Sequence, residues 1–176
     1  MKQLISDKNI NKLFGGDFEL ITHKNKPGQF NMDFDFERTM LCSKGEVLPI
    51  LRFYGWNPWT VSLGYNQKEN EIDNNLIDKK GFGLVRRPTG GRAVLHADEL
   101  TYSVVLNLHN NLTPQDIYRE IHFIILNGIK KLGASNTDFE KSQTDFREFY
   151  KKEQGMSLSC FASTARYEID MPCSFL

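Results

Sequence analysis

The chain has 176 residues, a formal net charge of zero and a pI of about 6.9. Apolar residues make up 40% of it and charged residues 25%, which is ordinary for a globular protein. The length predicts one domain that buries roughly two thirds of its unfolded surface. The neutral balance excludes a general nucleic-acid binder, because such proteins carry a large basic surplus.

The sequence shows neither a membrane helix nor a signal peptide. No apolar stretch approaches the roughly 20 residues of a membrane helix, and residues 1–8 lack the apolar core of a signal peptide. We therefore expect a cytoplasmic protein without membrane or nucleic-acid partners. Cys42, Cys160 and Cys173 make an odd count without metal-ligand spacing, so we predict free thiols and no metal site.

The N-terminal part begins with a polar segment, residues 1–17, which we expect to be a loosely held lead-in. A strand is predicted over 18–21, and Pro27-Gly28 marks a turn. Acidic residues after Asn31 favour a helix that begins with Asn31 as N-cap and ends at about Ser43.

Short strands follow. Residues 49–54 and 59–64 have strand patterns, and Asn57-Pro58 turns between them. A short helix is predicted over 71–80, stopped by Gly81.

The clearest patterns lie in the second half of the chain. Regular alternation predicts a strand over 101–108. A long helix is predicted from the N-cap Thr113 to Gly133, which closes it. Its apolar stripe consists of Ile117, Ile121, Ile124, Ile125 and Leu132. Residues 139–154 are charged and weakly periodic, which indicates a surface loop or a marginal helix. Neighbouring strands with short links favour antiparallel pairs, so the expected fold class is α+β, with helices layered on a largely antiparallel sheet.

The most informative segment is 86–96, with the sequence RRPTGGRAVLH. Adjacent glycines let a backbone bring its N–H groups close to a ligand, and guanidinium groups recognise carboxylates and phosphates through forked hydrogen bonds. The segment therefore indicates a loop that holds a small anionic or carbonyl-bearing group. An exposed hairpin turn would have the same composition. The spacing fits neither a P-loop nor a dinucleotide fingerprint.

Four blocks of the chain follow one another in order: RFYGW at 52–56, VSLGYNQ at 61–67, VRRPTGGRAVLH at 85–96 and ELTYSV at 99–104. Together they resemble the lipoate–protein ligase A and octanoyltransferase family. The helix start at Asn31-Met32 is also similar to the first helix of that family.

The resemblance implies the fold of the biotin and lipoate protein ligases, a mixed, largely antiparallel sheet flanked by helices. It covers a partial catalytic domain at 18–169, followed by a divergent tail at 170–176. It also implies an octanoyl or lipoyl substrate bound for a lysine of a lipoyl-carrier domain. The residues that match the acyl-binding loop of the family are Arg86, Arg87, Gly90, Gly91, Arg92, Ala93, Val94, Leu95 and His96.

Ser159-Cys160-Phe161 resembles the cysteine block of the transferase branch. The resemblance makes Cys160 the nucleophile that takes the acyl chain from octanoyl-acyl carrier protein as a thioester. The acceptor would be the lysine of a glycine cleavage H protein or of a 2-oxoacid dehydrogenase E2. Thioester exchange is nearly isoenergetic and cysteine is intrinsically nucleophilic, so this branch needs no cofactor. The ligase branch uses ATP and Mg to form an acyl-adenylate instead.

The chain departs from the family pattern after Cys160. The family has a lysine that would fall near Phe175, but no lysine follows Cys160 in this sequence. We expect a C-terminally truncated member, whose downstream DNA encodes the lysine segment in another frame. Three hypotheses stay open: a cysteine-dependent octanoyltransferase, an ATP-dependent lipoate ligase or lipoyl amidotransferase, and an inactive fragment that only binds acyl groups or a carrier protein.

Overall fold

The computed structural model describes residues 8–108, 112–139 and 169–170. They fall into two compact units. The larger unit contains Asp17–Asn107, and the smaller unit contains the described residues on either side of that range.

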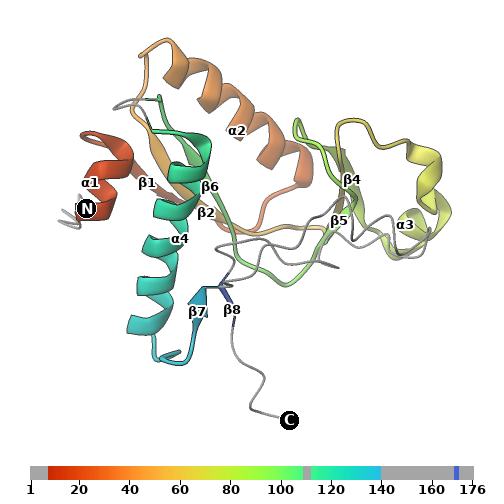
Figure 1. Ribbon diagram of the computed structural model, residues 1–176. Coiled ribbons are helices and arrows are strands. Elements are labelled where there is room, and N and C mark those ends of the chain that lie inside the picture. Colours follow the sequence, from red (N-terminus) through yellow and green to blue (C-terminus); the bar gives the residue numbers. More distant parts are fainter. Residues whose placement is uncertain (1–7, 109–111, 140–168, 171–176) are drawn as a thin grey trace. The chain divides into compact units, whose positions relative to one another are not determined.

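The larger unit contains two three-stranded sheets (Figure 1). In the first, β2 (Ile50–Tyr54) lies between β1 (Glu19–Thr22) and β6 (Thr101–Val105). In the second, β3 (Thr60–Leu63) lies between β4 (Gly83–Arg86) and β5 (Val94–His96). Each central strand has one parallel neighbour, β1 or β4, and one antiparallel neighbour, β6 or β5. The fold class is α+β with mixed sheets, as the sequence predicted.

Helix α2 (Gly28–Ser43) packs against a strand of each sheet, β4 and β6. Its first residue lies against the second sheet, since a Cβ on Gly28 would be 2.6 Å from the Thr60 methyl group. Farther along α2, Phe34 packs on a buried cluster of Cys42, Ile50 and Val105. In the sequence, α2 lies between β1 and β2. This explains their parallel pairing, because a helical crossover lets the second strand run in the same direction as the first.

The start of α2 differs from the prediction. The helix begins at Gly28, after Pro27, and Asn31 lies inside its first turn. The Asn31 side chain is fully buried and donates from Nδ2 to the Gly55 carbonyl over 3.2 Å. Asn31 is thus a tertiary anchor and not an N-cap, because its amide has buried partners outside the helix.

A second crossover links β3 to its parallel neighbour β4. It contains a 3-10 turn, Glu69–Glu71, and helix α3 (Asn74–Lys80). Asp73 caps α3 by accepting a hydrogen bond from the Leu76 N–H, and Gly81 ends the helix in the left-handed conformation, with φ of 66°. The predicted helix over 71–80 is therefore confirmed from Asn74 onward.

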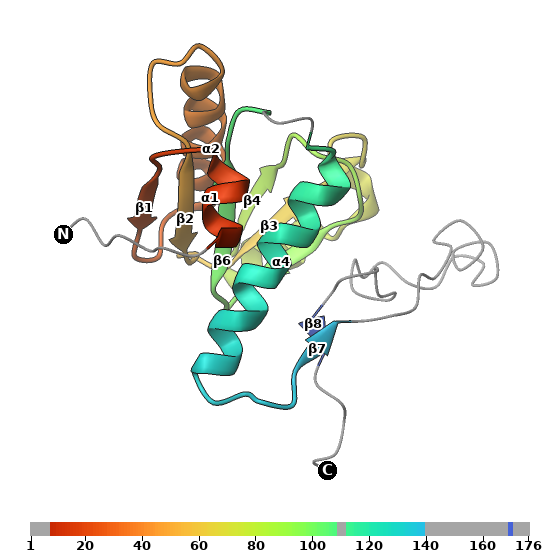
Figure 2. The same ribbon diagram turned by 60° about the vertical axis from the view of Figure 1, so that its left-hand side comes forward.

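The smaller unit places α1 (Lys8–Phe14) beside α4 (Pro114–Lys131), as Figure 2 shows. Ile10, Leu13 and Phe14 are buried, and Lys12 forms an ion pair of 2.6 Å with Glu120. Residues 8–14 differ from the loose lead-in that we expected, because their apolar side chains recur at helical spacing and have a packing partner.

Helix α4 begins as predicted. Thr113 accepts a hydrogen bond from the Asp116 N–H, and the Asp116 side chain accepts one from the Thr113 N–H, which completes a capping box. The Thr113 hydroxyl, which donates to the Asp116 carboxylate over 2.6 Å, and then the Thr113 N–H hold the pKa of Asp116 below its usual value. Leu132 differs from the predicted stripe, since it follows the last helical residue and is 89% exposed.

Two short strands complete the described part of the smaller unit. β7 (Asp138–Phe139) pairs antiparallel with β8 (Ile169–Asp170). Of the charged segment 139–154, only Phe139 belongs to the described residues. No helix in the described part of the chain has the length and apolar character that a membrane span requires.

Candidate functional site

The double-glycine loop, residues 87–93, connects β4 to β5. Both strands pair with β3, so the loop leaves the sheet on one side of β3 and re-enters it on the other. This topology places the two arms of the loop on either side of the end of β3, where Leu63 is followed by Gly64.

Arg87 holds the two arms together. Its Nη2 donates to the carbonyls of Gly90 (2.9 Å) and Arg92 (2.6 Å), and its Nε donates to the Gly90 carbonyl over 3.3 Å. Its Nη1 donates to the carbonyl and the hydroxyl of Ser62 on β3, over 2.9 and 3.2 Å. All five N–H groups of the guanidinium therefore have acceptors within the chain. In this conformation Arg87 shapes the loop.

The glycines allow a close approach of backbone to backbone. A Cβ on Gly64 would lie 2.0 Å from the Gly91 carbonyl oxygen, so only glycine fits at position 64. Gly91 has a φ of 97°, and a Cβ there would lie 2.8 Å from Arg87 Nη2. The Tyr65 N–H donates to the Thr89 carbonyl over 2.9 Å and joins the loop to the chain after β3.

Arg86 organises the neighbouring segment. Its Nη1 donates to the carbonyls of Gly64, Tyr65 and Gln67, over 2.9, 3.2 and 2.5 Å. Its Nη2 lies 3.5 Å from a carboxylate oxygen of Glu69. Arg86 thus holds the segment that follows β3, and Arg87 holds the double-glycine loop. The two segments meet at Gly64.

His96 ends β5 and is held at both ring nitrogens. Nε2 lies 2.9 Å from Ser62 Oγ, and Nδ1 lies 2.7 Å from Glu99 Oε1. The imidazole stacks on the indole of Trp56 with a centroid distance of 4.0 Å and an interplanar angle of 12°. The loop, β3 and the segment after β2 therefore meet at His96.

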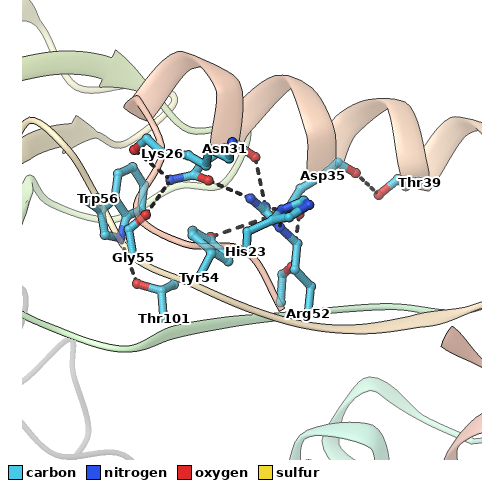
Figure 3. A network of polar contacts seen from close by, with 11 residues as sticks. His23, Lys26, Asn31, Asp35, Thr39, Arg52, Tyr54, Gly55, Trp56 and Thr101 are labelled. Atoms are coloured by element: carbon cyan, nitrogen blue, oxygen red, sulfur yellow. Dashed lines mark hydrogen bonds and ion pairs between the residues drawn. The ribbon is translucent and has the colours of Figure 1, made fainter. Parts of the chain in front are cut away.

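A buried polar cluster lies beneath α2, centred on Arg52 of β2 (Figure 3). Arg52 is fully buried; its Nη1 donates to Asp35 over 2.8 Å and its Nη2 to the Asn31 side chain over 2.5 Å. The guanidinium carbon lies 3.8 Å from the ring centroid of Tyr54. Such a buried charge is tolerated because it is paired and hydrogen-bonded.

Two titratable neighbours respond to this cluster. Partial burial, with Arg52 and Lys26 adding to it, holds the pKa of His23 below its usual value, so neutral His23 can accept the hydrogen bond from Arg52 Nε at 3.0 Å. Burial, with Asp35 beside it, raises the pKa of Tyr54 above its ordinary value. The phenol therefore stays protonated across the physiological range.

The nine predicted loop residues lie on one continuous segment, from the end of β4 to the end of β5. Their assignment to substrate binding stays a prediction. Cys160 lies outside the described residues. Within the described ranges, no three His, Cys, Asp or Glu side chains gather where they could hold a metal ion.

Several partners of the loop were not predicted from the sequence. Ser62, Glu99 and Trp56 contact His96 or Arg87, yet we had given them no role. Ser62 and Glu99 lie in the blocks 61–67 and 99–104 that carry the family resemblance. Hydrogen-bond partners across a sheet leave no spacing signal in a single sequence.

The chain is similar in sequence to known proteins of protein lipoylation. The family model of the lipoyl protein ligase A/B catalytic domain matches residues 27–158, a range that contains the double-glycine loop and the Arg52 cluster. The octanoyltransferase LipM of Staphylococcus aureus (strain NCTC 8325 / PS 47) is 42% identical over 156 residues, which are 86% of this chain and 56% of that protein. The chain spans about half the length of the curated relatives it matches.

Solved structures give the same result. A lipoate-protein ligase A bound with ATP superimposes with a TM-score of 0.58 and 27% identity, over 74% of this chain and 51% of that one. A bi-partite lipoate protein ligase of Thermoplasma acidophilum, solved in a study of an archaeal lipoylation system with its E2 lipoyl domain, gives 0.56 and 29%, over 72% and 48%. This chain belongs to the lipoyl protein ligase A/B catalytic domain family.

Proposed function

We propose that the chain is the acyl-binding part of an octanoyltransferase in protein lipoylation. The observation that carries the proposal is the 42% identity to a protein named octanoyltransferase over 86% of this chain. The geometry of the loop supports it, because Arg87 and the glycines hold a backbone turn whose shape does not depend on a ligand. Such preorganisation favours binding, since the loop pays little ordering entropy.

In the proposed reaction Cys160 is the nucleophile. The Cys160 thiol loses its proton and the thiolate attacks the thioester carbonyl of octanoyl-acyl carrier protein. A new C–S bond forms, the C–S bond to the carrier breaks, and the carrier sulfur leaves and takes up a proton. The lysine amine of a lipoyl-carrier domain then attacks the octanoyl-Cys160 thioester, an amide forms and the Cys160 thiol is restored. Overall one thioester is consumed and one amide is formed, and the acyl group enters already activated as a thioester, so the transferase requires no ATP or other cofactor.

A second candidate is an ATP-dependent lipoate ligase or a lipoyl amidotransferase. The similarity to a lipoate-protein ligase A bound with ATP favours the ligase form, which would need ATP and Mg. The third candidate is a fragment that binds an acyl group or a carrier protein without turnover. The acceptor in either active form would be a lipoyl domain, as the archaeal ligase and its E2 lipoyl domain suggest.

One experiment separates these candidates. The protein is incubated with octanoyl-acyl carrier protein, with and without ATP and Mg, and its intact mass is measured. We expect an ATP-independent octanoyl adduct that hydroxylamine removes and that Cys160→Ser lacks, whereas Cys42→Ser and Cys173→Ser retain it. ATP-dependent transfer to a lipoyl domain that survives Cys160→Ser would favour the ligase. Octanoate binding without an adduct would favour the inactive fragment.

A further inference from the structure

Ser62, His96 and Glu99 form an ordered set of hydrogen bonds beside the double-glycine loop. We propose that Ser62 and Glu99 are positioning residues: they hold the His96 ring with its Nδ1 proton toward Glu99 and its Nε2 toward the Ser62 hydroxyl. Through Ser62, they fix Arg87 and the loop that Arg87 shapes. The part of the proposal that concerns acyl binding rests on the proposed function.

The proposed direction of each hydrogen bond uses the chemistry of the groups. Arg87 Nη1 has only donors, so Ser62 Oγ must accept the bond of 3.2 Å between them. Ser62 Oγ also lies 2.9 Å from His96 Nε2, and the proposal assigns the one hydroxyl hydrogen of Ser62 to this contact. Nε2 is then an acceptor, and Nδ1 donates its proton to the Glu99 carboxylate over 2.7 Å.

The far end of the network is fixed in the same way. The Glu99 carboxylate also accepts a hydrogen bond of 2.7 Å from the Thr101 hydroxyl. Thr101 Oγ1 in turn accepts from the indole N–H of Trp56 over 2.7 Å. Since Trp56 is 2% exposed and stacks on His96, the imidazole is fixed at both nitrogens and on one face.

This arrangement has the residue types of a catalytic triad, but Ser62 cannot serve as a nucleophile in it. Ser62 is 1% exposed, so an acyl carbonyl has no approach to Oγ. The set therefore acts on the loop through Arg87.

The network extends from Glu99 through His96 and Ser62 to Arg87. The coupling reaches Gly90 and Arg92 because Arg87 contacts both of their carbonyls.

The test uses the ¹⁵N signals of the His96 ring at neutral pH. We expect a protonated Nδ1 and an unprotonated Nε2 in the wild type. Glu99→Ala removes the acceptor, so the ring should populate both tautomers and the amide signals of Gly90 and Gly91 should shift. Glu99→Gln retains an acceptor oxygen and should restore the wild-type tautomer. Asp98→Ala removes a carboxylate from the adjacent exposed residue and is the matched control.

Octanoate affinity provides the second measurement. With one net hydrogen bond of about 1 kcal/mol lost, Glu99→Ala should weaken binding roughly fivefold, and Glu99→Gln and Asp98→Ala should bind like the wild type. A wild-type ring protonated at Nε2, or a Glu99→Ala protein with unchanged tautomer and unchanged glycine signals, would overturn the proposal. The expected tautomer and glycine shifts in a protein that fails to bind octanoate would support the positioning network and reject the proposed function.

Discussion

At the scale of single residues, the central feature is an arginine directed inward. The double-glycine block resembles an anion-binding loop, and we expected its guanidinium groups to face a ligand. Arg87 instead donates to Ser62, Gly90 and Arg92. The sequence could identify the block but not this partner choice, because a guanidinium can donate to backbone carbonyls as well as to an external carboxylate.

The two glycines of the block should differ sharply in their tolerance of alanine. Gly91 has a positive φ and lacks room for a Cβ beside Arg87, whereas a Cβ on Gly90 meets nothing within 4 Å. Gly91→Ala should destabilise the loop by about 1–3 kcal/mol, and Gly90→Ala by less than about 1 kcal/mol. Octanoyl-adduct formation and urea unfolding of the two variants check this difference, and equal losses in both would contradict it.

At the scale of elements, the core of the larger unit depends on α2 meeting β2. The acidic residues after Asn31 predicted the helix and a strand pattern predicted β2, and Ser43 is the last residue of α2 as expected. It did not predict the function of Asn31, because N-cap preference is a local signal and the partners Arg52 and Gly55 lie far along the chain. A polar residue at a helix start has the same local pattern whether it caps the helix or anchors it.

Removing the buried charge should be far more costly than removing an exposed one. Arg52→Met leaves Asp35 and Asn31 without their partner, and breaking such a buried pair costs about 3–5 kcal/mol. Glu19→Gln breaks the more exposed ion pair between Glu19 and Arg38, which should cost less than about 1 kcal/mol. Urea denaturation at neutral pH gives both values. Similar values for the two variants would show that the Arg52 cluster does not stabilise the core.

At the scale of the whole chain, the fold class was predictable and the strand directions were not. Short links suggested mostly antiparallel pairs, yet β1 pairs parallel with β2, and β3 with β4. In each case a helix lies between the two strands, α2 in the first and α3 in the second. The sequence predicted both helices. It did not show that the strand after each helix pairs with the strand before it, because that pairing depends on tertiary packing.

Stability should depend on pH through His23. Its pKa is lowered in the folded protein from the usual 6.5, so the unfolded chain binds more protons near and below that pH. The free energy of unfolding should therefore fall as the pH drops through 6.5 and below. His23→Gln retains an acceptor for Arg52 but cannot titrate, so its stability should fall less over the same window. Urea unfolding across this pH range measures both slopes, and parallel slopes would rule out His23 as a source.

The central claim is that the loop shaped by Arg87 binds the acyl group. The most direct measurement is a titration of ¹⁵N-labelled protein with octanoate, followed by backbone amide signals, with acetate as a control that shares the carboxylate but lacks the chain. The account predicts saturable shifts that concentrate at Gly64 and across residues 89–96, and no such shifts with acetate. Saturable shifts that leave this loop unchanged, or an absence of saturable shifts, would contradict it.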